Sequence, residues 1–338
     1  MITAFELNHG RLQQVTVESL EDLQHCHPVW VDFESPTEEE RDWAKSIFEI
    51  DLPEEDEVDD IEASARFFEG ENGELHIRSD FFQHSAEDSD TMRVAFILKG
   101  GLLFSIRRDE LAQFRLLRLR ARRQPYYVRD EKDVLLQLLD IDVEYSADII
   151  EGIYDRLDKF SKQVLGSEMS DDTAGVVLSG IAVEEDLNGR IRRNLMDTRR
   201  AVSFLMRIKL LNEQQNDEGR QILRDIDSLD SHTAFLFDKI NFLMDATVGF
   251  ININQNKRVS QLTVFGLVFM PINILSGMGG MSEFSMMTAG LPWPIAYGGF
   301  LVGCMFVGWL TFILIRRVET KRMRKAKPAA AKSNLLRL

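Results

Sequence analysis

A long stretch almost free of charge is the feature that most constrains how this chain can fold. Between Arg258 and Arg316 the only charged residue is Glu283, although charged residues make up 28% of the 338-residue chain. A helix needs ~20 mostly apolar residues to cross ~30 Å of hydrocarbon. The stretch therefore predicts two membrane-spanning helices, at 259–279 and 295–315, joined by a short external loop at 280–294.

Basic residues predict the orientation of this hairpin. The loop contains no Lys or Arg, whereas Lys257 and Arg258 precede the first span and a basic tail, 316–338, follows the second. Loops rich in Lys and Arg stay on the cytoplasmic side of a membrane. We therefore expect the loop outside, both termini in the cytoplasm, and the lipid bilayer as a partner of the apolar helices.

The region before the spans changes its hydrophobic period once. In 1–125, short alternating runs at 4–7, 12–17, 29–33, 75–82, 93–98 and 102–106 predict strands of an α/β domain. From 126 to 218 the period is helical, with a break near 166–172, which predicts long amphipathic helices. A stalk helix at 219–258 should continue into the first span, because no proline lies between 219 and Pro271. The predicted fold class is an α+β membrane protein.

The first span carries a stripe of polar and small residues on one helical face. Its members recur at steps of seven, three, four, three and four: Asn256, Thr263, Gly266, Met270, Asn273 and Gly277. Polar groups in a membrane need partners, so the stripe should face other helices or water. Simple helix packing is the alternative to lining a water-filled path. With two spans per chain, such a path requires an oligomer.

Composition and motifs argue against several other functions. A net charge of −15 disfavours nucleic acid as a partner. The basic run 107–123 is better explained by internal ion pairs or a solvated helix face. His25-Cys26-His27 lacks a second ligand cluster at finger-like spacing. No phosphate loop, dinucleotide fingerprint or nucleophile–His–acid motif is present, so we expect no enzyme.

Three groups of residues together resemble one known family. The first is Trp30-Val31-Asp32-Phe33 followed by Ser35-Pro36-Thr37, the second is Leu138-Leu139-Asp140 with Tyr145, and the third is Asn256, Leu262-Thr263 and Phe269-Met270-Pro271. In their order and spacing they resemble the CorA family of divalent-cation channels, which includes the ZntB branch. The resemblance implies a funnel-shaped homopentamer in a bacterial inner (plasma) membrane that conducts hydrated Mg²⁺ through a central pore.

The family's signature triplet is altered in this chain. The family ends its first span with Gly-Met-Asn, nine residues after the proline, and the same count from Pro271 gives Gly280-Met281-Ser282, with Glu283 next. These four residues are the expected selectivity loop, where a ring of carboxylates would attract cations. The expected pore lining is Asn256, Val259, Leu262, Thr263, Gly266, Met270, Asn273 and Gly277.

The resemblance also implies regulation by Mg²⁺ bound to acidic groups between subunits. Carboxylates are the ligands that hard cations prefer. The candidate regulatory ligands are Asp56, Asp59, Asp60, Asp225 and Asp227. The sequence is equally compatible with these being solvent-exposed acids that bind no metal. Zn²⁺, Co²⁺ or Ni²⁺ remain alternative cargoes. A ZntB-type Zn²⁺ transporter and a non-conducting membrane sensor or scaffold remain alternative functions.

Overall fold

A computed structural model describes residues 1–53, 66–70, 72–84, 89–166, 169–280, 286, 289–290 and 292–334. Within these ranges the side chains of 84, 89, 90, 279 and 318–334 are not part of the description. The chain divides into two compact units, Met1–Thr247 and Val248–Leu338. Each unit is described by itself.

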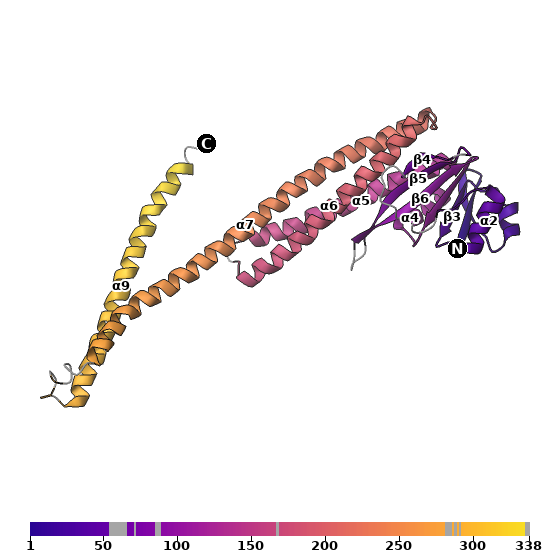
Figure 1. Cartoon of the computed structure of the whole chain (residues 1–338). Coiled ribbons are helices and arrows are strands. Elements are labelled where there is room, and N and C mark those ends of the chain that lie inside the picture. The colour runs from indigo at the N-terminus through magenta and orange to yellow at the C-terminus, as the bar shows by residue number, and fades with distance from the viewer. Residues whose placement is uncertain are drawn as a thin grey trace. The chain divides into compact units, whose positions relative to one another are not determined.

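The first unit is built on a mixed sheet (Figure 1). The described strands have the order β2-β1-β3-β7-β6-β5-β4, in which only β3 and β7 pair in parallel. All six predicted strand runs fall on strands; β4 is an additional short one. The strands are β1 Ile2–Asn8, β2 Arg11–Thr16, β3 Trp30–Glu34, β4 Phe67–Glu69, β5 Leu75–His84, β6 Ser89–Lys99 and β7 Leu102–Arg107.

Two short helices cover one face of the sheet. These are α1, Leu20–His25, and α2, Glu38–Phe48, and each begins with a capping box. In α2 the hydroxyl of Thr37 accepts the Glu40 N–H, while the Glu40 carboxylate accepts the Thr37 N–H, which satisfies two N–H groups that a helix start leaves unpaired. The Ser-Pro-Thr sequence therefore marks a helix start as predicted. Buried Val31, Phe33 and Phe104 lie in the core beneath these helices.

Three helices cover the opposite face (Figure 1). They are α4, Ala112–Arg123, α5, Glu131–Val164, and α6, Asp171–Arg207. Aromatic rings fill this side of the core. Phe5 stacks on Trp30 with ring centroids 4.3 Å apart, and Phe114 of α4 lies 5.8 Å from Trp30 and 5.7 Å from Phe81.

Helix α7 runs from Glu213 to Gly279 and contains Pro271, as expected for a stalk that continues into the first span. It begins six residues before the predicted start at 219 (219 − 213). The polar stretch that suggested a break contains the cap itself. Asn212 Oδ1 accepts the Gln215 N–H at 2.9 Å, and Gln215 Oε1 accepts the Asn212 N–H at 3.0 Å. This reciprocal pair starts the helix instead of ending one.

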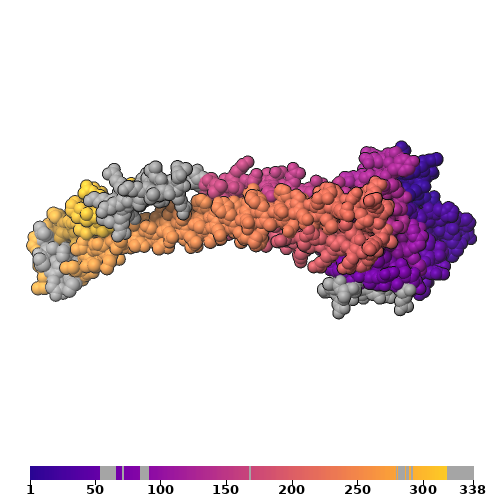
Figure 2. Space-filling view, turned by 90° about the horizontal axis from the view of Figure 1, so that it is seen from above, coloured from indigo at the N-terminus to yellow at the C-terminus, as the bar shows by residue number. Residues whose placement is uncertain are grey.

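The second unit contains the end of α7 and helix α9, Trp293–Asn334. Among the described residues, two helices are long and apolar enough to cross a membrane, Glu213–Met278 and Trp293–Arg317, and they overlap the two predicted spans. Figure 2 shows α9, in yellow, lying directly on the orange end of α7. Helix α9 continues past 315 into the basic tail.

Candidate functional site

Helix α7 turns one apolar face toward α9. Val264, Val268 and Ile272, spaced by four residues, are partly buried there. The matching positions on α9 are small: Cys304 and Gly308 are buried and Thr311 is partly buried. Small residues four apart let two membrane helices approach closely. The contact between the two spans therefore uses the face of α7 that carries no Asn.

The polar stripe lies on the opposite face of α7. An α-helix turns ~100° per residue, so Gly266 and Met270, each two residues from Val268, point ~160° away from it. Gly266 and Gly277 both face open space, with no atom within 4 Å of where a Cβ would lie. Asn256 and Asn273 are also exposed. The structure thus separates the two faces cleanly and leaves the stripe uncovered within one chain.

The stripe alternates polar and apolar side chains along the helix. Thr263 donates its hydroxyl to the Val259 carbonyl oxygen at 2.8 Å, which satisfies its donor and leaves oxygen lone pairs facing outward. Met270 and Leu262 are 60% and 69% exposed, and Val259 is exposed as well. All eight predicted lining residues are therefore accessible in a single chain. Such a surface in a membrane requires a further helix or water against it.

The expected outer loop is only partly described. Gly280 follows the end of α7, and its N–H donates to the Ser276 carbonyl oxygen at 3.1 Å. Met281, Ser282 and Glu283 lie outside the described residues, as do the candidate regulatory ligands Asp56, Asp59 and Asp60.

The two remaining candidate regulatory ligands are already engaged within the chain. Asp227 forms an ion pair with Arg199 of α6. The Asp225 carboxylate accepts hydrogen bonds from Gln221 Nε2 at 2.9 and 3.0 Å. In the described part of the chain, no three His, Cys, Asp or Glu side chains are placed to hold one metal ion.

An acidic patch that sequence reasoning missed surrounds Asp140 of α5. Burial, the neighbouring Glu144 and then Asp225 of α7 raise the Asp140 pKa to about 6. Arg120, which is paired with Glu144 at 2.7 Å, lowers it only in part. Glu144 lies four residues after Asp140 on α5, but the contact with Asp225 could not be read from the helical repeat of α5, because Asp225 lies on α7.

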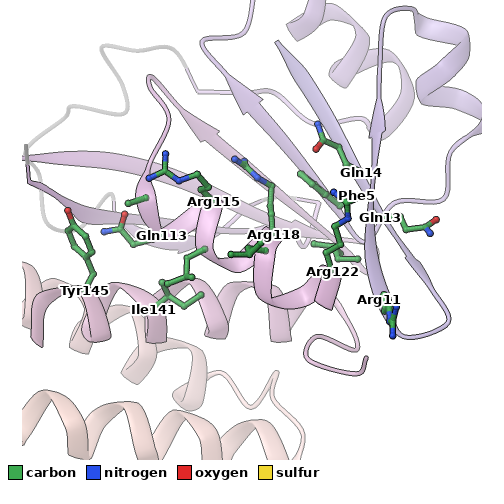
Figure 3. Close-up of a pocket in the computed structure, with 14 residues that line it drawn as sticks. Phe5, Arg11, Gln13, Gln14, Gln113, Arg115, Arg118, Arg122, Ile141 and Tyr145 are labelled. Atoms are coloured by element: carbon green, nitrogen blue, oxygen red, sulfur yellow. The ribbon is translucent and has the colours of Figure 1, made fainter. Parts of the chain in front are cut away.

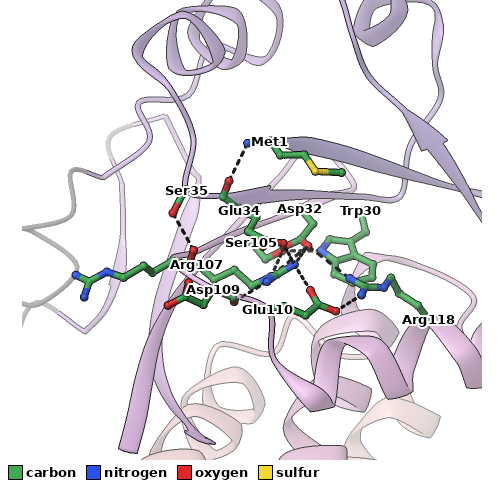
Figure 4. A network of polar contacts seen from close by, with 11 residues as sticks. Met1, Trp30, Asp32, Glu34, Ser35, Ser105, Arg107, Asp109, Glu110 and Arg118 are labelled. Carbon is green, nitrogen blue, oxygen red and sulfur yellow. Dashed lines mark hydrogen bonds and ion pairs between the residues drawn. The ribbon is translucent and has the colours of Figure 1, made fainter.

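Part of the basic run 107–123 forms the internal ion pairs that the sequence suggested. Figure 4 shows the Arg107 guanidinium facing the buried carboxylate of Asp32, with its Nη2 at 2.8 Å from Oδ2. The Arg118 side chain forms an ion pair with Glu110. Ser105 donates to Asp32 at 2.7 Å and accepts from Trp30 Nε1 at 2.8 Å. These contacts join β3, β7 and α4, so part of the run is an internal ion-pair network.

Fold and stripe together define a two-span membrane protein with an α/β domain and an uncovered polar face on its first span. The family model described as CorA-like Mg²⁺ transporter protein matches residues 27–317. This chain belongs to that family.

Curated relatives agree over nearly the whole chain. The chain is 40% identical to the magnesium transport protein CorA of Salmonella typhimurium and 39% identical to that of Escherichia coli, covering 94% of this chain and 99% of each relative. Among solved structures, the complete CorA magnesium transporter from Methanocaldococcus jannaschii aligns over 94% of this chain and 98% of its own. It has a TM-score of 0.72 at 17% identity. Full-length CmaX aligns over 94% of this chain and 97% of its own, with a TM-score of 0.65 at 14% identity.

Proposed function

We propose that this protein transports Mg²⁺ across the bacterial inner membrane through a pore at the centre of a homopentamer. Membership of the CorA-like family supports the cargo. The observation that carries the proposal is the position of the polar stripe, on the face of α7 turned away from α9. A hairpin that uses one face for its own packing keeps the other face free for copies of itself and for water.

More than one copy is needed to form the path. One chain supplies two spans that are long and apolar enough among its described residues, and two helices cannot enclose water. Five copies of α7 with their stripes inward would surround a pore, and α9 would lie outside against lipid. Asn256 and Asn273 would then face the ion path instead of hydrocarbon, which removes the cost of polar groups in lipid.

The ion would pass with its water shell. Mg²⁺ gives up its water reluctantly, so the lining needs groups that hydrogen-bond to water. Asn256, Thr263 and Asn273 carry such oxygens. Met270 and Leu262 would form two apolar rings, and apolar constrictions of this kind close a pore by excluding water.

The outer mouth would be formed by Gly280, Met281, Ser282 and Glu283. Ser282 supplies a hydroxyl that hydrogen-bonds to the first water shell. Glu283, the only charge between Arg258 and Arg316, would form a ring of carboxylates that concentrates cations. The basic tail after the second span supports cytoplasmic termini and an external mouth.

Cytoplasmic acids would regulate the pore. Asp225 and Asp227 of α7, together with Asp56, Asp59 and Asp60, would bind Mg²⁺ between subunits in the assembled protein. The patch around Asp140 adds negative charge next to Asp225. Cations bound between subunits would favour the closed assembly by mass action.

The test is ion uptake into liposomes that contain the purified protein, with Mg²⁺, Zn²⁺, Co²⁺ and Ni²⁺ compared separately. The proposal expects saturable Mg²⁺ uptake that an inside-negative potential increases, since ~2.3 kcal/mol is gained per charge per 100 mV. Uptake of Zn²⁺ with no uptake of Mg²⁺ would identify a Zn²⁺ transporter. No uptake of any of the four ions would indicate a sensor or scaffold.

A further inference from the structure

A basic groove lies in the first unit, between the sheet edge and helix α4 (Figure 3). It has a volume of about 960 Å³, near the upper end of the ~300–1,000 Å³ range of small-molecule sites. Strand β2 forms one wall, α4 the other, and α5 contributes Ile141 and Tyr145. None of the pore residues discussed above lines it.

Four arginines line the groove and no acidic residue does: Arg11, Arg115, Arg118 and Arg122. Arg115, Arg118 and Arg122 recur at steps of three and four, which places them on one face of α4. Arg118 is paired with Glu110. In the described part of the chain, Arg11, Arg115 and Arg122 have no ion-pair partner. Three uncompensated guanidinium groups around one cavity favour an anion with several charges.

The rest of the lining is apolar with a few amide groups. Phe5, Leu12, Leu116 and Ile141 provide the apolar surface. Gln113 lines the groove although its residue is only 1% exposed, and its Oε1 has no hydrogen-bond partner among the described residues. Its Nε2 is already used, donating to the Phe82 carbonyl oxygen and to Asp142. A buried acceptor without a donor is unfavourable, and a ligand with an N–H group would supply the missing donor.

The two kinds of lining lie toward different ends of the groove. Figure 3 shows Gln113, Ile141 and Tyr145 grouped at one end and Arg11 with Arg122 at the other, with Arg115 and Arg118 between them. A ligand that fits would carry phosphates at one end and a flat ring with N–H donors at the other. Guanidinium groups match phosphate oxygens with paired hydrogen bonds. An acyl chain would leave Gln113 Oε1 unsatisfied.

We propose that the groove between β2 and α4 binds a nucleoside polyphosphate. The phosphates lie on Arg115, Arg122 and Arg11, and the base lies against Tyr145 with its amine donating to Gln113. The site binds without catalysis, because the sequence holds no phosphate loop and the groove has no acidic side chain. Mg²⁺ on the phosphates would compete with the arginines for the same oxygens, so the metal-free nucleotide is the preferred form.

The test is calorimetric titration of ATP into the full-length protein in detergent with EDTA present. The double variant Arg115→Gln/Arg122→Gln should bind ATP at least about tenfold more weakly, since hydrogen bonds to charged groups contribute ~1.5–3 kcal/mol each and ~1.4 kcal/mol is tenfold. The matched control is Arg123→Gln, an exposed arginine of the same helix that does not line the groove. It should bind like the wild type. Thermal melts without ligand check that every variant is folded.

Two results would overturn the proposal. One is the absence of ATP binding to the folded wild-type protein. The other is an equal loss of affinity per arginine removed in Arg123→Gln and in the double variant, which would attribute the effect to overall charge. Inorganic triphosphate is the second probe. It should bind more weakly than ATP, and equal affinity would refute the part of the proposal that assigns the base to the Gln113 end.

Discussion

Gly308 of α9 lies so close to Ile272 of α7 that an added Cβ would come within 2.8 Å of Ile272 Cδ1. With Val268 Cγ1 4.0 Å from the same position, the contact identifies the face of α7 that packs on α9 inside the chain. The face opposite to it carries the stripe of Asn, Thr, Gly and Met. This packing leaves the stripe uncovered within one chain.

Widening this contact should destabilise the hairpin. We expect Gly308→Val to lower the melting temperature of the protein in detergent, because overpacking costs ~1–3 kcal/mol. Gly303→Val is the matched control, since nothing lies within 4 Å of the corresponding position on the same helix. Equal melting temperatures for both variants would show that the close approach at Gly308 does not stabilise the hairpin.

The apolar rings should control leakage. Replacing Met270 by Ser should increase Mg²⁺ leak into liposomes at rest, because a polar ring no longer excludes water. Met305→Ser is the control: Met305 is also exposed, at 72%, but lies on α9. Unchanged leak in Met270→Ser and in Leu262→Ser would show that the stripe only packs helices.

The altered triplet should show its effect in the concentration dependence of uptake. We expect Glu283→Gln to raise the Mg²⁺ concentration needed for half-maximal uptake more than Ser282→Ala does, because the carboxylate ring supplies the long-range attraction. Ser282→Asn should move uptake toward that of relatives with Gly-Met-Asn. If Glu283→Gln has no effect while Ser282→Asn creates uptake where the wild type has none, the native protein is a sensor.

Stability of the first unit should depend on pH through Asp140. Its folded-state pKa is raised to about 6, mainly by burial and by Glu144. A raised pKa means that the folded state prefers protonated Asp140. The stability that this preference contributes is fully present below the Asp pKa of the unfolded chain, ~4, and is lost as the pH rises through 6. Asp140→Asn should therefore be more stable than wild type at pH 7.5. Its stability should increase less than that of the wild type when the pH is lowered. Thermal melts between pH 4.5 and 7.5 would measure this, and an identical pH profile in the variant would exclude Asp140 as the group.

Magnesium should stabilise the assembled protein if the acids on α7 bind it. Millimolar Mg²⁺ should raise the melting temperature more than NaCl at matched ionic strength, since binding only to the native state stabilises it. Asp225→Asn with Asp227→Asn should reduce this shift, whereas Asp238→Asn, an exposed acid of the same helix, should not. Equal shifts with both salts would leave the acids as a solvated surface.

Elements with strong local patterns could be predicted from the sequence. The predicted runs Val29–Phe33 and Leu102–Ile106 are short and mostly apolar, and they coincide within one residue at each end with the buried strands β3 and β7. Two features depended on contacts that the pattern does not record. The start of α7 was misplaced because Asn212 and Gln215 look like a break unless their mutual hydrogen bonds are known.

The basic groove was hidden for a similar reason. The sequence suggested internal ion pairs or a solvated helix face for the run 107–123, and ion pairs are present at Arg107, Arg118 and Arg120. Arg115 and Arg122 instead line a cavity whose other wall is β2, about a hundred residues earlier in the chain. The stripe on α7 was visible in the sequence because it lies on one helix. That the stripe is uncovered within one chain could not be predicted, because it depends on α9 packing on the opposite face of α7.

Substituted-cysteine accessibility tests the central claim most directly. Cys26 and Cys304 would first be replaced by alanine, and Thr263→Cys and Gly277→Cys introduced separately, with Val302→Cys on the exposed face of α9 as control. A charged, thiol-reactive reagent should block Mg²⁺ uptake into liposomes in both stripe variants and leave the Val302→Cys variant active. If modification of the stripe cysteines leaves uptake unchanged, α7 does not line the ion path.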